Sequence, residues 1–179
     1  MTLVNDTLVG QSRPGRARLI PERLIPERLS QARLSQIVTA LAVRPGGWGD
    51  VVRFEAGRRW YQRLELADDH EVWLLSWLPG QSTGFHDHGL AAGAFAVAQG
   101  QVRERTVAAG QGQPVRNLTV ARGSVRAFGP HYVHDVVNVS AEPAITVHAY
   151  SPPLTAMRRF KLTESGLVHT ATEQAEQDW

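Results

Sequence analysis

The stretch that decides the fold is residues 80–88, Gly-Gln-Ser-Thr-Gly-Phe-His-Asp-His, which follows an apolar run over residues 72–78. That run is typical of a buried strand. His86 and His88 are two residues apart, and on an extended strand such residues point to the same face. Two imidazoles can therefore meet one metal ion, and the candidate for a third nitrogen is His134. Two histidines in this spacing also occur in ordinary polar turns, so they need support from the rest of the chain.

From Asp50 onward, short β-rich runs alternate with turn residues such as Pro79-Gly80 and Gly129-Pro130. A spacing of about ten residues between such runs is typical of an antiparallel sandwich or barrel. The sequence therefore predicts an all-β fold, a small β-barrel or jelly roll. The predicted strands cover residues 60–66, 72–78, 94–97, 101–107, 115–120, 124–128, 134–139, 144–150 and 157–162.

The N-terminal part of the chain has a different pattern. Over residues 30–43 the apolar positions follow helical spacing, and Arg-Pro-Gly-Gly at 44–47 stops the helix. Before it, the sequence Leu-Ile-Pro-Glu-Arg occurs twice, at 19–23 and 24–28, and each proline could open a helical turn. The sequence thus predicts three regions: a flexible leader and helical region over 1–48, a barrel over 49–165, and a polar C-terminal tail over 166–179.

The composition excludes several classes of protein. With 179 residues the chain suits one domain with a real core. It has no cysteine, which excludes disulfides, zinc fingers, a thiolate nucleophile and any iron–sulfur cluster held by its own thiolates. There is no apolar run long enough for a transmembrane helix and no apolar core of a signal peptide, so we expect a cytoplasmic protein.

The charge is nearly balanced, with a formal net charge of +2. Up to Arg44 the chain carries seven arginines against three acidic residues, so this segment is basic. A basic arm could contact nucleic acid or a membrane, but no aromatic residues are interleaved with these arginines. We therefore expect a solvated surface and neither a nucleic-acid nor a membrane partner. We also expect a monomer.

Two glycine-framed patterns surround the histidines. The first runs Gly80, five residues, His86-x-His88, four residues, Gly93, six residues and Gly100. The second runs Gly123, five residues, Gly129-Pro130-His131, two residues, His134, three residues and Asn138. These patterns resemble the two conserved motifs of the cupin superfamily, a family of small β-barrels.

The cupin resemblance implies which side chains hold a metal. The matching ligands are His86, His88 and His134, whereas the position of the usual glutamate ligand holds Gly93. His131 is the alternative third ligand, but its offset from the end of the motif is wrong. Imidazole suits iron, zinc, copper or nickel alike, so the ligands do not choose the metal. A site without its own anion should favour an anionic guest such as a thiolate.

Residues 134–153 and the triplet Tyr-Gln-Arg at 61–63 resemble the cysteine dioxygenase (type I) family of thiol dioxygenases, and the resemblance covers about residues 60–153. It implies one Fe(II) per chain, chelated by the sulfur and amine of a small thiol substrate. It also implies that both atoms of O₂ go to that sulfur and give a sulfinate.

Thr146, His148 and Tyr150 alternate along one predicted strand and so share a face. The resemblance implies a hydrogen-bonded row here, in which His148 orients the catalytic Tyr150 and Thr146 supports it from a position where serine is usual. The alternative is that these are buried polar residues of the core. Many animal enzymes crosslink this tyrosine to a cysteine. Gly93 stands at the cysteine position, so we expect no crosslink.

The resemblance also implies that Arg63 binds the substrate carboxylate and that Tyr61 lines the same pocket. A guanidinium suits this role because its planar fork pairs with two carboxylate oxygens. Arg63 could instead be an exposed strand residue. A slip of one residue would turn Gln62 inward, as in mercaptopropionate-type relatives. The alternative carboxylate partners are Arg105 and Arg126.

The sequence therefore predicts an iron-dependent dioxygenase that converts L-cysteine and O₂ to cysteine sulfinate. The first alternative is the same reaction on 3-mercaptopropionate or another small thiol acid. The second is a non-catalytic cupin, in which the three histidines hold a structural or sensory metal.

Overall fold

The computed structural model describes residues 28–108 and 113–174. The expectations for the leader, for nearly all of the tandem repeat, and for the last five residues of the tail lie outside these ranges. Among the described residues, no helix has both the length and the apolar character that crossing a membrane requires.

The main body is built from one large and two small antiparallel sheets. The five strands of the large sheet lie in the order β1 (Tyr61–Leu66), β2 (Glu71–Trp77), β9 (Ala144–Ser151), β4 (Ala92–Gln99) and β7 (Val125–Phe128). One small sheet has the order β11 (Gly166–Gln174), β10 (Ala156–Thr163) and β3 (Phe85–Asp87). The other has the order β6 (Val115–Ala121), β5 (Gln101–Val107) and β8 (Asp135–Val137).

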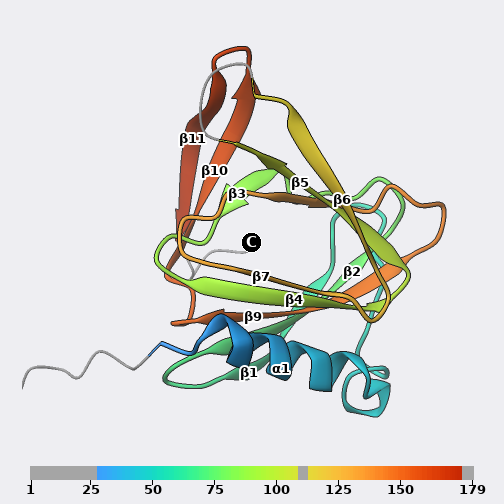
Figure 1. Ribbon diagram of the computed structural model, residues 1–179. Coiled ribbons are helices and arrows are strands. Elements are labelled where there is room, and N and C mark those ends of the chain that lie inside the picture. Colours follow the sequence, from blue (N-terminus) through green and yellow to red (C-terminus); the bar gives the residue numbers. More distant parts are fainter. Residues whose placement is uncertain (1–27, 109–112, 175–179) are drawn as a thin grey trace, which may run out of the picture.

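The small sheets lie opposite the large one and enclose an interior (Figure 1). Two isolated bridges, Ser82 with Val137 and His86 with His134, connect the two small sheets to each other. The result is the all-β barrel that the sequence predicts.

The central strands of the large sheet are buried on both faces, so alternate side chains along each strand belong to two separate hydrophobic cores. On β4, for example, Ala94 and Ala96 face helix α1 (Gln31–Ala42), whereas Phe95 and Val97 face the barrel interior. Figure 1 shows α1 lying across the outer face of the large sheet. Because β4 presents small alanines to the helix, the helix can approach the sheet closely.

Helix α1 confirms the predicted helix over residues 30–43. Ser30 caps it, because its side chain accepts a hydrogen bond from the Arg33 backbone N–H. Leu34 and Val38 are fully buried against the sheet. The helix ends before Val43, and a short 3₁₀ turn, η1 (Pro45–Gly47), follows.

The C-terminal part differs from its prediction. Residues 166–174 form β11, which pairs with β10 as a hairpin, whereas the sequence predicted a polar tail from residue 166. The error arises because most of β11 is exposed, so its polar side chains hide the strand pattern. The hairpin matters for the site, since β10 pairs on its other edge with β3, placing Arg159 opposite His86. The division of the chain into domains stays a prediction.

Candidate metal centre and pocket

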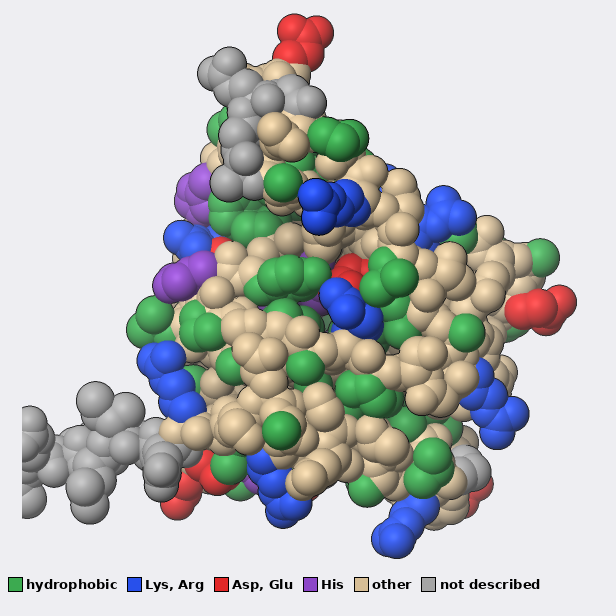
Figure 2. Space-filling view, viewed as in Figure 1, with side chains coloured by type: hydrophobic (Ala, Val, Ile, Leu, Met, Phe, Trp, Pro, Cys, Tyr) green, Lys and Arg blue, Asp and Glu red, His purple; other side chains and the backbone are tan. Residues whose placement is uncertain are grey.

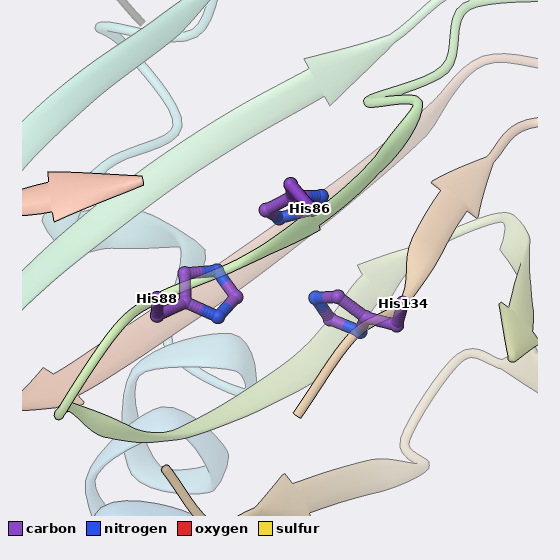
Figure 3. A group of neighbouring side chains, drawn as sticks. All are labelled: His86, His88 and His134. Atoms are coloured by element: carbon purple, nitrogen blue, oxygen red, sulfur yellow. The ribbon is translucent and has the colours of Figure 1, made fainter. Parts of the chain in front are cut away.

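The three predicted metal ligands lie together inside the barrel. His86 lies on β3, His88 follows that strand, and His134 directly precedes β8. The backbones of His86 and His134 exchange two hydrogen bonds, of 2.9 and 3.0 Å. Figure 3 shows the three rings around a common space. Their candidate ligand atoms all lie within 4.8 Å of one another, and all three residues are buried.

Two of the rings are held by partners that can only accept a hydrogen bond. His86 Nδ1–H donates to the Gly84 carbonyl at 3.0 Å, and His134 Nδ1–H donates to Glu104 Oε1 at 2.9 Å. The Nε2 atom of each ring therefore carries a free lone pair, as a metal ligand requires. Both nitrogens of His88 are buried and have no hydrogen-bond partner in the part of the chain that the structure describes. Since unpaired polar atoms are costly in a core, the histidines fit a metal ion between them.

The surroundings of His86 and His88 favour their neutral forms. Burial lowers the pKa of His86 and of His88, and the neighbouring rings lower each pKa further. Burial alone would raise the pKa of Glu104, but hydrogen bonds from His134 and Arg126 outweigh it, so the net shift is downward. Neutral imidazole is the form that binds metals, so the site is ready for a cation at neutral pH.

Beside the histidines lies a cavity of about 40 Å³. A water molecule needs about 10–15 Å³ on this scale, so the cavity accepts only a few small groups. His86, His134, His148 and Tyr150 form its polar inner wall. The rest of the wall is mainly apolar or aromatic and includes Tyr61, Trp73, Leu75, Val136, Leu154 and Met157. The structure thus places Tyr61 at the pocket, as predicted from the sequence.

The predicted row of Thr146, His148 and Tyr150 extends from the cavity into the core. Thr146 Oγ1 lies 2.8 Å from His148 Nε2, and His148 Nδ1 lies 3.3 Å from the Tyr150 hydroxyl. The sequence did not single out the far end of the row, where Trp77 Nε1–H donates to Thr146 Oγ1 at 2.8 Å.

The donor from Trp77 gives this row a direction. Indole nitrogen can only donate, so the Thr146 hydroxyl accepts from Trp77. Among the described residues its own proton has no acceptor other than His148 Nε2, so it donates there. His148 then carries its proton on Nδ1 and donates to the Tyr150 oxygen. Burial lowers the pKa of His148 and raises that of Tyr150, so both stay neutral. This arrangement leaves the Tyr150 O–H available to donate into the pocket.

Arg63 does not line the pocket, contrary to the sequence prediction. Its side chain is 46% exposed, its Nη1 lies 3.6 Å from Glu71 Oε2, and its guanidinium lies over the Trp73 ring at 5.4 Å. Glu71 is buried, so its carboxylate attracts the nearest cation on the strand edge. Arg63 therefore forms an ion pair with Glu71 beside the pocket.

Arg59 lies at the pocket instead, two residues before Tyr61. Its guanidinium lies 5.0 Å from the centre of the Trp77 ring, and its Nη1 donates to the Ser82 carbonyl at 3.3 Å. Its Nε is buried without a partner among the residues described. Burial, aided by the charge of Arg159, lowers the pKa of Arg59 to about 10. The alternation that favoured Arg63 could also have indicated Arg59, because positions 59, 61 and 63 share a face.

A second cation at the pocket, Arg159 on β10, was also missed by the sequence. Its Nε and Nη2 donate to Glu173 Oε2 at 2.9 and 2.7 Å, and its Nη1 donates to the Thr83 carbonyl. Glu173 therefore balances its charge. No motif marks Arg159, since only the pairing of β10 with β3 brings it to the site.

The remaining alternatives lie elsewhere. Gln62 is exposed and pairs in register with Leu74, whose side chain packs on the helix side of the sheet. His131 lies outside the cluster of histidines, with its Nδ1 3.1 Å from Arg158 Nη2. The other two alternatives are each bound to a buried acid: Arg105 to Asp135 and Arg126 to Glu104.

Several solved structures are similar to this one. One is TT1209 from Thermus thermophilus, 20% identical, with a TM-score of 0.51, covering 59% of this chain and 93% of that protein. Another is a cupin superfamily protein from Desulfitobacterium hafniense, 11% identical, with a TM-score of 0.49, covering 59% and 87%. None of the curated proteins compared matches the chain.

The family model for cysteine dioxygenase type I matches residues 22–163, which is most of the chain. The match includes the three histidines, the pocket wall and the Thr146–Tyr150 row. Together with the buried histidine cluster, it identifies the protein as a thiol dioxygenase or a metal-binding cupin of the same kind. The chain therefore belongs to the cysteine dioxygenase type I family.

Proposed function

We propose that this protein is an Fe(II)-dependent dioxygenase that converts L-cysteine and O₂ to cysteine sulfinate. One observation carries the proposal: three buried imidazoles form one cluster, and two of them, His86 and His134, line a small pocket together with a guanidinium whose Nε has no partner among the described residues. A structural metal site has no need of such a cation. Family membership supports iron as the metal, with His86, His88 and His134 as its ligands.

The proposed reaction needs no further reagent. The thiol sulfur loses four electrons and gains both atoms of O₂, which accepts those four electrons, and the thiol proton is released with the sulfinate. Bound Fe(II) would supply a place where thiolate and O₂ meet and exchange electrons. The protein contributes a preorganised pocket that holds the substrate in one orientation.

Arg59 is the residue that we propose to bind the substrate carboxylate, in place of Arg63. Its Nε donor is buried and unpaired within the described ranges, and a carboxylate would pair with it in the charge-assisted geometry that guanidinium favours. An anion beside Arg59 would also offset the burial that lowers its pKa. Tyr61 would pack against the substrate from the same face of the sheet.

Tyr150 and His148 are the residues that we propose to assist the chemistry. The Tyr150 O–H is a neutral donor at the pocket wall and would hydrogen-bond to the substrate or to oxygen. His148 fixes the direction of that donor through its own hydrogen bond, and Thr146 fixes the protonated nitrogen of His148.

A thiol acid without an amine, such as 3-mercaptopropionate, is the second candidate substrate. No carboxylate lines the pocket in the described part of the chain, whereas two guanidiniums do. Such a wall offers an ammonium group no partner. It is compatible with a substrate whose only charges are negative.

The predictions of a cytoplasmic monomer without nucleic-acid or membrane partners belong to this proposal. On the face in Figure 2, the blue Lys and Arg side chains stand apart from one another, with uncharged surface between them. That face carries no continuous basic patch of the kind that binds nucleic acid, as far as the described residues form it.

Oxygen uptake tests the proposal. Protein with a measured Fe(II) content is mixed with L-cysteine, with 3-mercaptopropionate, or with no thiol. We expect uptake that needs a thiol and is matched by sulfinate. An Arg59→Met variant should raise KM with iron content unchanged, whereas Arg63→Met should change KM little. A preference for 3-mercaptopropionate would select the second substrate, and no uptake with any thiol would contradict the dioxygenase assignment.

A further inference from the structure

Three buried carboxylates surround the histidine cluster, and each is paired with a partly exposed arginine. These pairs are Asp87 with Arg158, Asp135 with Arg105, and Glu104 with Arg126. Asp87 and Asp135 are next to clustered histidines in sequence, but their carboxylates bind arginines and not the imidazoles. Among these three, Glu104 alone accepts a hydrogen bond from one of the three clustered imidazoles.

Glu104 is held firmly in place. It lies in the middle of β5, where alternation turns Val102 and Glu104 inward. One carboxylate oxygen, Oε1, lies 2.9 Å from His134 Nδ1, and the other, Oε2, accepts from Arg126 Nε at 2.6 Å. The side chains of Glu104 and His134 are each only 1% exposed. Water therefore does not compete for this contact.

The three imidazoles differ in the hydrogen-bond partner of the ring nitrogen. His134 is backed by a carboxylate, His86 by a neutral carbonyl oxygen, and His88 by no hydrogen-bonding group in the described ranges. A carboxylate that accepts the Nδ1 proton of an imidazole fixes its tautomer and makes Nε2 a stronger ligand. His134 should therefore be the strongest of the three ligands.

We infer that Glu104 is a positioning residue for the metal centre, acting through His134. It holds the His134 ring with Nε2 toward the shared space and provides, one hydrogen bond away, a negative charge that the ligand set itself lacks. This inference rests on the proposed metal site, because it concerns the affinity of that site. It assigns Glu104 no contact with the substrate.

Asp135 provides a matched control. It is as buried as Glu104, carries the same charge, and is bound to an arginine in the same way. It is adjacent to His134 in sequence, but its carboxylate accepts from Ser82 and Thr83 instead of an imidazole. General loss of a buried charge would affect both acids, whereas loss of the imidazole contact affects Glu104 alone.

The test is metal affinity, measured on the full chain by competition with a chromogenic chelator for Co(II) and Fe(II). For Glu104→Gln we expect Kd to rise about 10- to 100-fold, as for other outer-sphere partners of metal-bound histidine. The Co(II) absorption bands should shift as well. Asp135→Asn should bind metal nearly as tightly as the wild type.

Equal affinities of Glu104→Gln and the wild type would overturn the inference and leave the metal site standing. No binding by the wild type would instead contradict the proposed function. If Glu104→Gln does not fold, Glu104→Asp keeps the charge but withdraws the oxygen from Nδ1. It should still weaken binding about 10-fold, and unchanged binding by that variant would overturn the inference.

Discussion

Gly93 lies directly against the ring of Phe128, in a place where no side chain fits. A Cβ atom at position 93 would lie 2.5 Å from two ring atoms of Phe128 and 3.0 Å from Tyr150. Both residues are its register partners on the flanking strands. The Phe128 ring in turn stacks on His88, with 5.3 Å between the ring centres. Position 93 therefore has no room for a metal-binding side chain, because the Phe128 ring that stacks on His88 fills the space beside it.

Replacing Gly93 by alanine should destabilise the protein. The added methyl group would force Phe128 or the β4 backbone to move, and overpacking of this kind costs about 1–3 kcal/mol. The free energy of unfolding in denaturant measures the effect. Gly57→Ala is the control, because a Cβ there meets nothing within 4 Å. Equal stability of Gly93→Ala and the wild type would show that the wall is looser than described.

Metal content should distinguish His134 from His131. His134→Ala removes one of three clustered nitrogens and should reduce bound iron from one per chain to a small fraction. His131→Ala should leave the content unchanged, because His131 lies outside the cluster, beside Arg158. Elemental analysis of purified, Fe(II)-loaded protein provides the measurement. The opposite pattern would identify His131 as the third ligand.

The sequence was sufficient to predict the barrel and the pairing of His86 with His88 for physical reasons, whereas the cupin resemblance supported His134 as the third ligand. The strand pattern has a period of two, so it indicates both the strands and the face on which His148 and Tyr150 lie. The spacing of His86 and His88 on an extended backbone needs no tertiary information. Even for β4, which is rich in alanine, the apolar residues at 94–97 were enough to predict part of the strand.

The features that were missed depend on distant pairing. Alternation puts Arg59 and Arg63 on the same face, but only the position of β1 in the barrel decides which one reaches the pocket. Arg159 comes to the site because β10 pairs with β3. Glu104 meets His134 because β5 pairs with β8, across thirty positions of sequence. No local pattern contains these relationships.

Arg59 and Arg63 should have opposite effects on stability. The pKa of Arg59 is lowered by burial, so its charge is less favourable in the folded protein than in water. Arg59→Met should therefore raise the free energy of unfolding of the substrate-free protein, by up to about 1 kcal/mol. Arg63→Met should lower it by up to about 1 kcal/mol, because the half-exposed ion pair with Glu71 is lost while Glu71 still accepts from the Leu154 N–H. Two variants with equal stability would contradict this assignment.

The effect of Arg59 on stability should depend on pH in a definite direction. Its folded pKa of about 10 lies below its usual value, so folding favours the deprotonated form. The destabilising contribution is complete well below pH 10 and declines as the pH rises above 10. The gain from Arg59→Met should thus be constant between about pH 7 and 9 and shrink above pH 10. Thermal unfolding over this pH range measures it, and a gain that grows above pH 10 would contradict the shift.

Loss of the Tyr150 hydroxyl should affect turnover but not metal binding. Tyr150→Phe keeps the ring that packs on His88, with 4.6 Å between the ring centres, and removes only the donor at the pocket. We expect kcat/KM to fall about 10- to 100-fold, the range for a lost hydrogen bond to a charged group. Iron content should stay the same. If turnover is unchanged, the row from Trp77 to Tyr150 is a core network without a catalytic role.

The central claim is that the three-histidine site and the pocket beside it add both atoms of O₂ to a thiol sulfur. Mass spectrometry of the product formed by Fe(II)-loaded protein under oxygen-18 gas tests it most directly. We predict a sulfinate with both oxygen atoms labelled, formed in amounts equal to the oxygen consumed and absent with His134→Ala. A disulfide, a singly labelled product, or no product from protein shown to hold iron would contradict the account.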